Sequence, residues 1–430
     1  MTTIKLGTAI SNIYENGIVR RIASNFGWSV VSEAIGRGVF FITNIYLART
    51  LGVSNFGLFT LAQTITFYFW LAVDLGTNMY GIREIAKRKE NAEEIINPLL
   101  TLRIIAGLIV FTVYTTSVFL FDMTLEKKLV FASAGLYLIT YSFYTDWALK
   151  GLEKFRLIAV GSMLSSLVFL AGTLLFVKMS GQIVVAVSVW SVSYLAGGIW
   201  LFYFLHKKLG RRYRPSFDIK VWLTHLRESI FFTTSGSLMI LYQYFPIFLL
   251  GIFFGSYELG LFSAPYRMVL AAGTAGFLLP SAFYPILSEL YHKDRGNFRK
   301  THRNLQIIML ATGVVIGVTC ALYADDIIGI LFGSKYSDSI TVFKIIVWLI
   351  PLYFVRYSFG SVLYSAGFQR KHNIATLSGV IAMLISGLIL IPEFGITGAS
   401  VSLIIAEMFI VISMWIISTL VFREKVLKIT

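Results

Sequence analysis

Apolar stretches of about 20 residues or more follow one another along almost the whole chain. A helix needs roughly 20 largely apolar residues to cross a hydrocarbon core about 30 Å thick. Of the 430 residues, 57% are hydrophobic and only 14% are charged, which is too little charge to cover a soluble fold. The stretches are too long and too continuous for the short alternating strands of a membrane barrel. The sequence therefore predicts an all-α integral membrane protein.

The apolar stretches predict twelve transmembrane helices, at 28–49, 56–80, 98–121, 129–149, 155–178, 182–205, 230–254, 259–288, 304–332, 340–366, 373–392 and 397–421. With the N-terminus inside, 27 Lys and Arg residues fall in inner loops and tails, and only five fall in outer loops. This asymmetry follows the positive-inside rule and predicts a multi-pass protein of the cell membrane with both termini in the cytoplasm. Basic inner loops that meet anionic lipid account for the net charge of +15, so no nucleic-acid partner is expected.

Three segments lie outside the predicted helices. Residues 1–27 lack the apolar core of a signal peptide, and their apolar residues recur at helical spacing, which predicts an amphipathic helix on the cytoplasmic membrane surface. Residues 206–229 form the longest loop, which is basic, and residues 422–430 form a cytoplasmic tail. The single cysteine, Cys320, has no partner for an internal disulfide.

An internal repeat divides the chain. The segments "LGVSNFGLF" (51–59) and "FGSYELGLF" (254–262) align Gly52 with Gly255 and Gly57 with Gly260, at a separation of 203 residues. Further collinear matches begin at Tyr141-Ser142-Phe143 and Tyr357-Ser358-Phe359. These matches predict two six-helix lobes, 28–205 and 230–421, joined by the basic linker 206–229 and related by a pseudo-two-fold axis along the membrane normal. Transporters built from such repeats bind substrate at the repeat interface.

The first predicted helix, within "SVVSEAIGRGVFFITNIYLART" (29–50), carries ionisable residues near its middle. Glu33, Arg37 and Asn44 lie on one polar face, and Glu33 and Arg37 are four residues apart, so they can pair. Charges at this depth normally face a bundle interior or an aqueous cavity, because exposure to lipid costs several kcal/mol. The alternative is a structural ion pair that fixes helix packing.

Two more arginines lie within predicted helices of the second lobe. Arg267 is expected in the outer half of its helix, where it either lines a cavity or snorkels to the interface. Arg356 lies deeper, and its alternative role is to pair with a carboxylate such as Asp146 or Glu407. Arg103 lies close to a helix end, where snorkelling explains it.

Asp74, Asp146 and Glu407 are the candidates for binding a coupling ion, H⁺ or Na⁺. The chain has no Walker A loop, no HExxH, no CxxC and no GxSxG, and its predicted outer loops are short. We therefore expect neither an enzyme, nor a cofactor, nor a bound metal.

Two segments resemble a known family. "ARTLGVSNFGLFTLAQTI" (48–65) and "DLGTNMYGIREIAKRK" (74–89) are similar to the polysaccharide and O-antigen flippases (Wzx type) of the multidrug/oligosaccharidyl-lipid/polysaccharide exporter superfamily. The positions that match the family pattern are Ala48, Arg49, Leu51, Gly52, Gly57, Phe59, Asp74, Gly76, Arg83, Glu84, Ile85 and Ala86. The twelve-helix, two-lobe plan extends the resemblance over nearly the whole chain.

The resemblance implies a transporter whose central cavity is lined by helices 1, 2, 7 and 8, where cationic side chains meet the diphosphate of a polyprenyl-diphosphate-linked glycan. It places Arg37 and Arg267 in that role by position, and it also suggests polysaccharide polymerase or assembly proteins as partners. Arg groups bind phosphate oxygens bidentately. Gln243 and nearby aromatic residues are candidates for sugar contacts, the latter being Tyr141, Tyr144, Trp147, Tyr242, Tyr244, Tyr353 and Tyr357.

Two other functions stay open. A cation-coupled, multidrug-type exporter of small molecules would need an acidic cavity, whereas arginines dominate here. A membrane glycosyltransferase, polymerase or ligase would need a large external loop with catalytic residues.

Overall fold

The computed structural model of the protein describes the backbone of residues 2–208, 210, 213–230 and 233–424, and the side chains of these residues except 2–26, 28–35, 208, 233–237 and 420–424. All regular secondary structure in these ranges is helical, which confirms the predicted all-α class. The α-helices are α1 (Thr2–Asp74), α2 (Thr77–Lys87), α3 (Glu93–Leu120), α4 (Leu125–Thr140), α5 (Asp146–Gly151), α6 (Phe155–Phe176), α7 (Ile183–Tyr203), α8 (Ile219–Ser229), α9 (Thr233–Phe253), α10 (Gly255–Ala275), α11 (Leu278–Lys293), α12 (Arg295–Leu322), α13 (Ala324–Phe332), α14 (Ser339–Ile346), α15 (Leu349–Ser365) and α16 (Gln369–Glu424).

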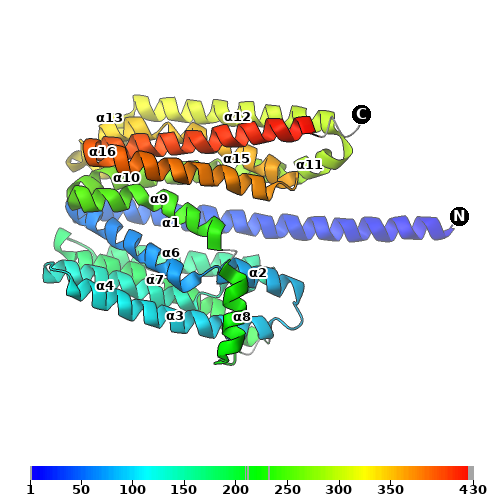
Figure 1. Cartoon of the computed structure of the whole chain (residues 1–430), viewed down its shortest axis with the longest axis horizontal. Coiled ribbons are helices and arrows are strands. Elements are labelled where there is room, and N and C mark those ends of the chain that lie inside the picture. Colours follow the sequence, from blue (N-terminus) through cyan, green and yellow to red (C-terminus); the bar gives the residue numbers. More distant parts are fainter. Residues whose placement is uncertain (1, 209, 211–212, 231–232, 425–430) are drawn as a thin grey trace.

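Eight helical segments within the described ranges are long and apolar enough to cross a membrane. Two of them contain a glycine with non-helical backbone angles, Gly52 in α1 (φ 74°) and Gly395 in α16 (φ 53°). Glycine adopts positive φ without the penalty that a Cβ imposes on other residues. In Figure 1 the chain reverses direction within α1 and within α16, so each comprises two antiparallel helices. The predicted total of twelve crossings stays a prediction.

The helices form two groups with α1 between them (Figure 1). Helices α2 to α7 lie on one side and α9 to α16 on the other, and α1 packs against both α6 and α10. The start of α1 extends beyond the bundle, at the same end as the last turns of α16. The side chains of residues 2–26 are not among those described, so the predicted surface helix at 1–27 stays a prediction. Helix α1 is therefore the element that both groups share.

Helix α1 touches α10 of the second group where the internal repeat predicted equivalence. A Cβ added at Gly57 would lie 1.8 Å from the carbonyl oxygen of Ser256, and one added at Gly260 would lie 2.0 Å from the carbonyl oxygen of Val53. Ser256 follows Val53 by the same 203 residues that separate the two glycines, so the contact is reciprocal. Each helix backbone approaches the other at a position that only glycine leaves open.

More contacts join α1 to the second group at this end, which the charge distribution predicts to be the outer one. Arg49 at the end of the first half of α1 donates from Nε to the carbonyl oxygen of Leu331 at 2.8 Å, and from Nη2 to that of Ile330. The Tyr336 hydroxyl donates to the carbonyl oxygen of Ala48 at 3.1 Å. These bonds and the glycine contact hold α1 against the second group at the predicted outer end.

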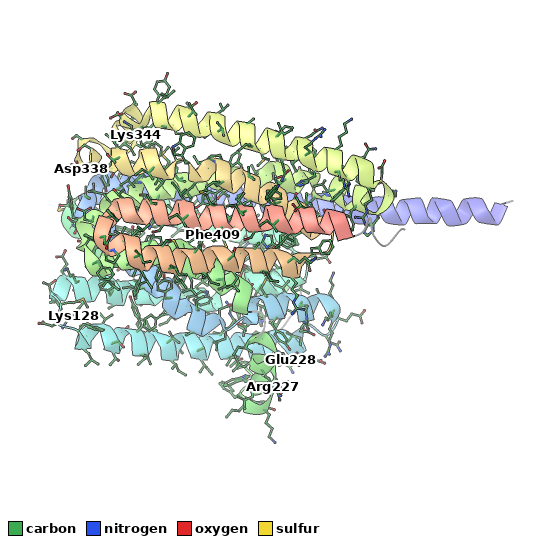
Figure 2. The ribbon with its side chains drawn as sticks, turned by 45° about the horizontal axis from the view of Figure 1, so that its top comes forward. Lys128, Arg227, Glu228, Asp338, Lys344 and Phe409 are labelled. Carbon is green, nitrogen blue, oxygen red and sulfur yellow. The ribbon has the colours of Figure 1, made fainter. Side chains whose placement is uncertain are left out.

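Large apolar side chains cover the outside of the bundle. Phe409 on α16 is 52% exposed and faces outward near the middle of its helix (Figure 2). Lys128, Asp338 and Lys344 lie toward one end of the bundle, whereas Arg227 and Glu228 lie on α8, which projects near the other end (Figure 2). An apolar belt between charged ends is the surface of a membrane protein.

Candidate functional site

Five of the six residues predicted to bind substrate line one cavity between α1 and helices α9, α10 and α15. This cavity, called the arginine cavity here, has a volume of about 290 Å³. Its described lining residues are Arg37, Phe40, Phe41, Asn44, Gln243, Tyr244, Ile247, Tyr266, Arg267, Leu270, Ala271, Thr274, Tyr353, Arg356 and Tyr357. Three of them are arginines and none is an Asp or Glu. The sixth predicted residue, Glu33, has a side chain outside the described ones.

Arg37 and Arg267 approach the cavity from opposite sides. Arg37 on α1 donates from Nη1 to Thr274 Oγ1 on α10 at 2.6 Å. Arg267 on α10 donates from Nη2 to Gln63 Oε1 at 2.5 Å and to Thr60 Oγ1 at 3.2 Å, and both acceptors belong to the second half of α1. Each arginine is thus held by the helix that carries the other. Arg267 is bonded to α1 in the interior and its Nε is buried, so the snorkelling alternative for Arg267 is wrong.

Hydrogen bonds to Gln63 and Thr60 leave one donor of Arg267 available for a ligand. Its Nε is buried and has no hydrogen-bond partner among the described residues. The guanidinium lies 5.6–6.0 Å from the ring centres of Phe40, Phe56 and Phe59. Its two acceptors are neutral, so the positive charge is not cancelled by the contacts described. A buried unpaired donor on a cationic group favours an anionic ligand, because leaving it unpaired costs free energy.

The charge of Arg356 is offset by Glu407, which is buried and does not line the cavity. The Nε of Arg356 lies 3.0 Å from Glu407 Oε1, and Glu407 is fully buried. The Tyr242 hydroxyl donates to the other carboxylate oxygen of Glu407 at 2.7 Å. The predicted alternative, pairing of Arg356 with Glu407, is therefore present, and Arg356 still lines the cavity through its guanidinium, stacked near Tyr353 and Tyr357.

Asn44 and Gln243 add neutral polar groups. Asn44 donates from Nδ2 to the carbonyl oxygen of Phe40 at 2.7 Å, while its buried Oδ1 has no partner among the described residues. Gln243 lies half-buried on α9 beside Tyr244. Both side chains offer hydrogen bonds to a ligand in the arginine cavity.

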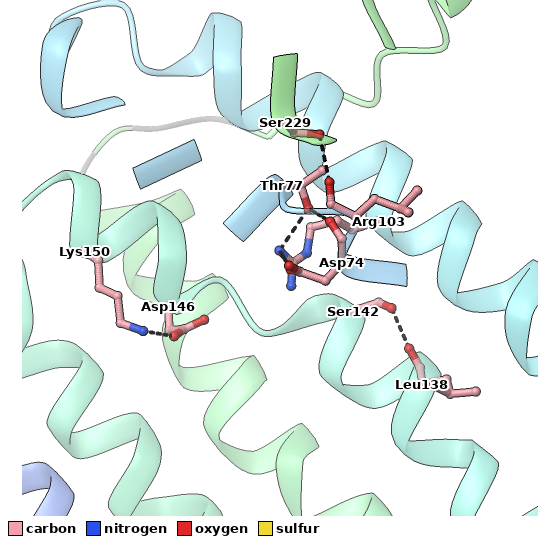
Figure 3. Close-up of polar contacts among 9 residues, drawn as sticks. Asp74, Thr77, Arg103, Leu138, Ser142, Asp146, Lys150 and Ser229 are labelled. Atoms are coloured by element: carbon pink, nitrogen blue, oxygen red, sulfur yellow. Dashed lines mark hydrogen bonds and ion pairs between the residues drawn. The ribbon is translucent and has the colours of Figure 1, made fainter. Parts of the chain in front are cut away.

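The other coupling candidates lie away from this cavity, in a region that Figure 3 shows. Asp74 accepts from Arg103 Nη1 at 3.0 Å, and Asp146 accepts from Lys150 Nζ at 2.6 Å. Arg103 is completely buried, with Trp70 and Trp147 near its guanidinium at 5.2 and 5.6 Å. The expectation that Arg103 snorkels is wrong, because α2 and α5 cover this end of the bundle with protein.

A second cavity of about 270 Å³ adjoins the arginine cavity. We call it the serine–aromatic cavity. Its described lining residues are Gly36, Arg37, Phe40, Phe67, Tyr144, Ser162, Ser165, Ser166, Phe169, Trp190, Ser193, Tyr194 and Tyr244. Arg37, Phe40 and Tyr244 belong to both linings, so the cavities share a wall.

Sequence reasoning missed most of the second cavity. The serines of "GSMLSSL" (161–167) recur at helical spacing on α6, and Trp190, Ser193 and Tyr194 do so on α7. This periodicity was the available signal, but serines and aromatic residues are common in membrane helices. Of the predicted aromatic residues, Tyr144, Tyr244, Tyr353 and Tyr357 line a cavity, whereas Trp147 and Tyr242 are buried away from both.

Comparison with known proteins identifies the family of the chain. The profile of a family described as polysaccharide biosynthesis protein matches residues 22–291, well over half of the chain. The chain belongs to this family. A relative from Shigella dysenteriae named "Putative O-antigen transporter" is 25% identical over 87% of this chain and 94% of its own length. A Haloferax volcanii protein named "Probable low-salt glycan biosynthesis flippase Agl15" is 23% identical over 86% of this chain and 78% of its own.

Solved structures share the fold. The lipid II flippase MurJ, in an inward closed conformation, superimposes with a TM-score of 0.72 at 16% identity, over 91% of this chain and 87% of the other. A multidrug resistance MATE family transporter of the MOP superfamily, in an inward-facing conformation, gives 0.71 at 15% identity, over 94% and 99%. The predicted family is confirmed by the profile match, and the apolar helices support the predicted multi-pass membrane protein. The solved structures show that the fold is shared.

Proposed function

We propose that this member of the polysaccharide biosynthesis family is a flippase that moves a polyprenyl-diphosphate-linked oligosaccharide from the inner to the outer leaflet for surface polysaccharide or O-antigen assembly. The observation that carries the proposal is the arginine cavity, which gathers three guanidinium groups and no carboxylate among its described lining residues. Relatives named as an O-antigen transporter and a glycan flippase, and the shared fold with a lipid II flippase, support the same substrate class.

The roles follow from charge and position. A diphosphate is a multivalent anion that planar guanidinium donors grip through paired hydrogen bonds. Arg37 and Arg267 would bind it from opposite walls, each releasing or sharing the neutral acceptor that now holds it. Arg356 would add a weaker attraction, because Glu407 offsets its charge. The polyprenyl chain stays in the bilayer while the head group crosses.

Transport would proceed by alternating access between two six-helix lobes, with both termini in the cytoplasm of the cell. The reciprocal Gly57–Gly260 contact supports the pseudo-two-fold relation at one point of the interface. The contacts at the predicted outer end would separate, and an inner end would close, when the substrate moves outward. A coupling ion, H⁺ or Na⁺, would bind at Asp74, Asp146 or Glu407, each of which is now paired with a cationic side chain.

The second candidate function is a cation-coupled, multidrug-type exporter. The observation that favours it is the fold shared with a MATE transporter. The charge of the arginine cavity opposes organic cations, since like charges in a low-dielectric site repel. Resistance to cationic drugs in an overexpressing strain would favour this alternative. Polysaccharide polymerase and assembly proteins stay proposed partners.

The proposal is tested by substitution in a strain that depends on this protein for its surface polysaccharide. Arg37→Ala and Arg267→Ala should each leave the protein in the membrane but accumulate inner-leaflet lipid-linked glycan. Lys128→Ala is the control, because it removes an equal charge from the surface, away from both cavities. Normal polysaccharide export by both arginine variants would refute the assigned site.

A further inference from the structure

One face of the linker helix α8 is fixed to the rest of the protein. His225 Nδ1 lies 2.9 Å from the Tyr80 hydroxyl on α2, and the Ser229 hydroxyl donates to the carbonyl oxygen of Leu75 at 2.9 Å. His225 and Ser229 are both buried, and they are four residues apart, so they lie on the same face of the helix. Helix α8 is therefore held in one orientation, which gives its other faces a defined direction.

A second face of α8 is apolar and exposed. Ile219 is 65% exposed, Leu223 is 60% exposed, and Ile230, the residue that follows the helix, is 58% exposed. At about 100° per residue, these three side chains project within about 40° of one another. A contiguous apolar surface of this kind marks a contact with a membrane or with another protein.

The direction and the level of α8 favour a membrane surface. In Figure 1 the helix runs across the direction of α3 and α7, and Figure 2 shows it near the end of the bundle away from the predicted outer one. The chain just before α8 is bonded to α3: Arg214 N donates to Asn97 Oδ1 at 3.2 Å. Ser216 N donates to Thr101 Oγ1 at 3.1 Å, and Thr101 lies just inside the predicted membrane crossing 98–121. Helix α8 thus lies along the predicted inner surface of the bilayer, where acyl chains meet head groups.

Positive charge follows one edge of the apolar face. Lys220 and Arg227 project within about 20° of each other on the helix, next to that face. Both are exposed, and neither forms an ion pair with another residue that the structure describes. The two acidic residues of the linker are engaged elsewhere, because Asp218 accepts from two backbone N–H groups at the start of α8 and Glu228 lies beside the Tyr80 hydroxyl. This uncompensated positive charge is complementary to anionic head groups.

We propose that α8 is an interfacial helix that inserts Ile219, Leu223 and Ile230 into the inner leaflet and binds anionic phospholipid head groups through Lys220 and Arg227. Helices with an apolar face and a basic edge lie in the membrane plane at this depth. Each basic residue near an anionic surface is worth about fivefold in affinity, so the pair contributes up to about 25-fold. The inference does not depend on which substrate the protein transports.

The experiment measures which lipids touch α8 in the full-length protein, reconstituted in nanodiscs with Cys320 replaced by serine. Leu223→Cys carries a fluorophore on the apolar face, and the matched control is Thr224→Cys, which is also exposed but points about 100° away. The nanodiscs contain phosphatidylcholine and phosphatidylglycerol at equal mole fractions, with bromine on the acyl chains of one lipid or the other. Both brominated lipids should quench the label at Leu223 far more than the label at Thr224, and phosphatidylglycerol should quench it severalfold more than phosphatidylcholine.

Charge variants separate head-group binding from insertion. Lys220→Gln with Arg227→Gln should bring the two lipids to nearly equal quenching, whereas Lys220→Arg with Arg227→Lys should keep the preference, because it keeps the charge. Quenching by phosphatidylcholine should persist in both pairs, which shows that α8 is still folded and inserted. Lys128→Gln, at the other end of the bundle, should leave the preference unchanged.

Three results would overturn the proposal. A label at Leu223 that neither lipid quenches would mean that the apolar face lies outside the membrane and serves a protein partner. Equal quenching by the two lipids in the wild type, or a preference that survives Lys220→Gln with Arg227→Gln, would show that these two residues do not bind anionic head groups.

Discussion

The reciprocal glycine contact between α1 and α10 predicts what Gly57→Ala will do. An added Cβ would lie 1.8 Å from the Ser256 oxygen, whereas an ordinary contact needs at least 3.4 Å, so the helices would have to part by about 1.6 Å. The atom in the way is backbone, which no side-chain rotation can move. Gly260→Ala should act alike, since its Cβ would lie 2.0 Å from the Val53 oxygen.

The substitution has two effects, and only one of them differs between the closed and open forms. Alanine in place of glycine stabilises a helix interior by about 1 kcal/mol. Forcing extra volume into a packed contact costs about 1–3 kcal/mol. The helical gain applies to the closed and open forms alike, so the closed outer end should lose about 1–3 kcal/mol relative to an open one, which shifts their ratio roughly 5- to 150-fold. Gly38→Ala is the control, because no atom lies within 4 Å of its added Cβ and only the helical gain applies.

The assay is labelling by a membrane-impermeant maleimide. Cys320 is first replaced by serine, and Val53→Cys then reports on the contact, because Val53 is 6% exposed. Labelling should be slow in this background, rise severalfold when Gly57→Ala or Gly260→Ala is added, and stay slow with Gly38→Ala. Equal labelling in all four proteins, with equal melting temperatures, would refute the inferred outer closure.

Three further predictions concern buried charges and the linker. Glu407→Ala should destabilise the protein by about 3–5 kcal/mol in thermal unfolding, because it leaves Arg356 buried without its counter-charge; a melting temperature unchanged from the wild type would contradict this. Arg103→Met should lower the melting temperature less, since the aromatic side chains around Arg103 can pack on a methionine, and a drop as large as that of Glu407→Ala would argue against this. Burial lowers the pKa of His225 below 6.5, so protonation opposes the folded contact between α8 and Tyr80, and proteolysis of the linker should accelerate as the pH falls below 6.5 in the wild type but not in His225→Gln.

The clustering of the arginines was predictable because charge in an apolar helix leaves few options. Arg37, Arg267 and Arg356 had to avoid lipid, so an interior cavity followed from the cost of exposure. Their partners were not predictable. Gln63 and Thr60 accept from Arg267 only because the second half of α1 runs antiparallel to the first and meets α10.

Errors arose where distance along one helix was taken as depth in the membrane. Arg103 lies within two turns of its predicted helix start, yet it is fully buried, because Thr77 of the short helix α2 and Trp147 of the short helix α5 cover it. The predicted helix 129–149 ends as α4 at Thr140, and Asp146 lies on α5 beyond a break. Such caps depend on packing between segments, which a hydropathy pattern does not record. The repeat, by contrast, aligned Gly52 with Gly255, and both have positive φ.

The place of α1 between the two groups has a consequence for synthesis. Arg37 hydrogen-bonds to Thr274, which lies 237 residues further along the chain. At about 5–20 residues per second, the ribosome needs roughly 12 to 47 s to deliver that partner. For that interval the guanidinium emerges into the insertion machinery with α10 not yet made. Until α10 is inserted, the insertase or neighbouring helices must therefore stabilise the first half of α1.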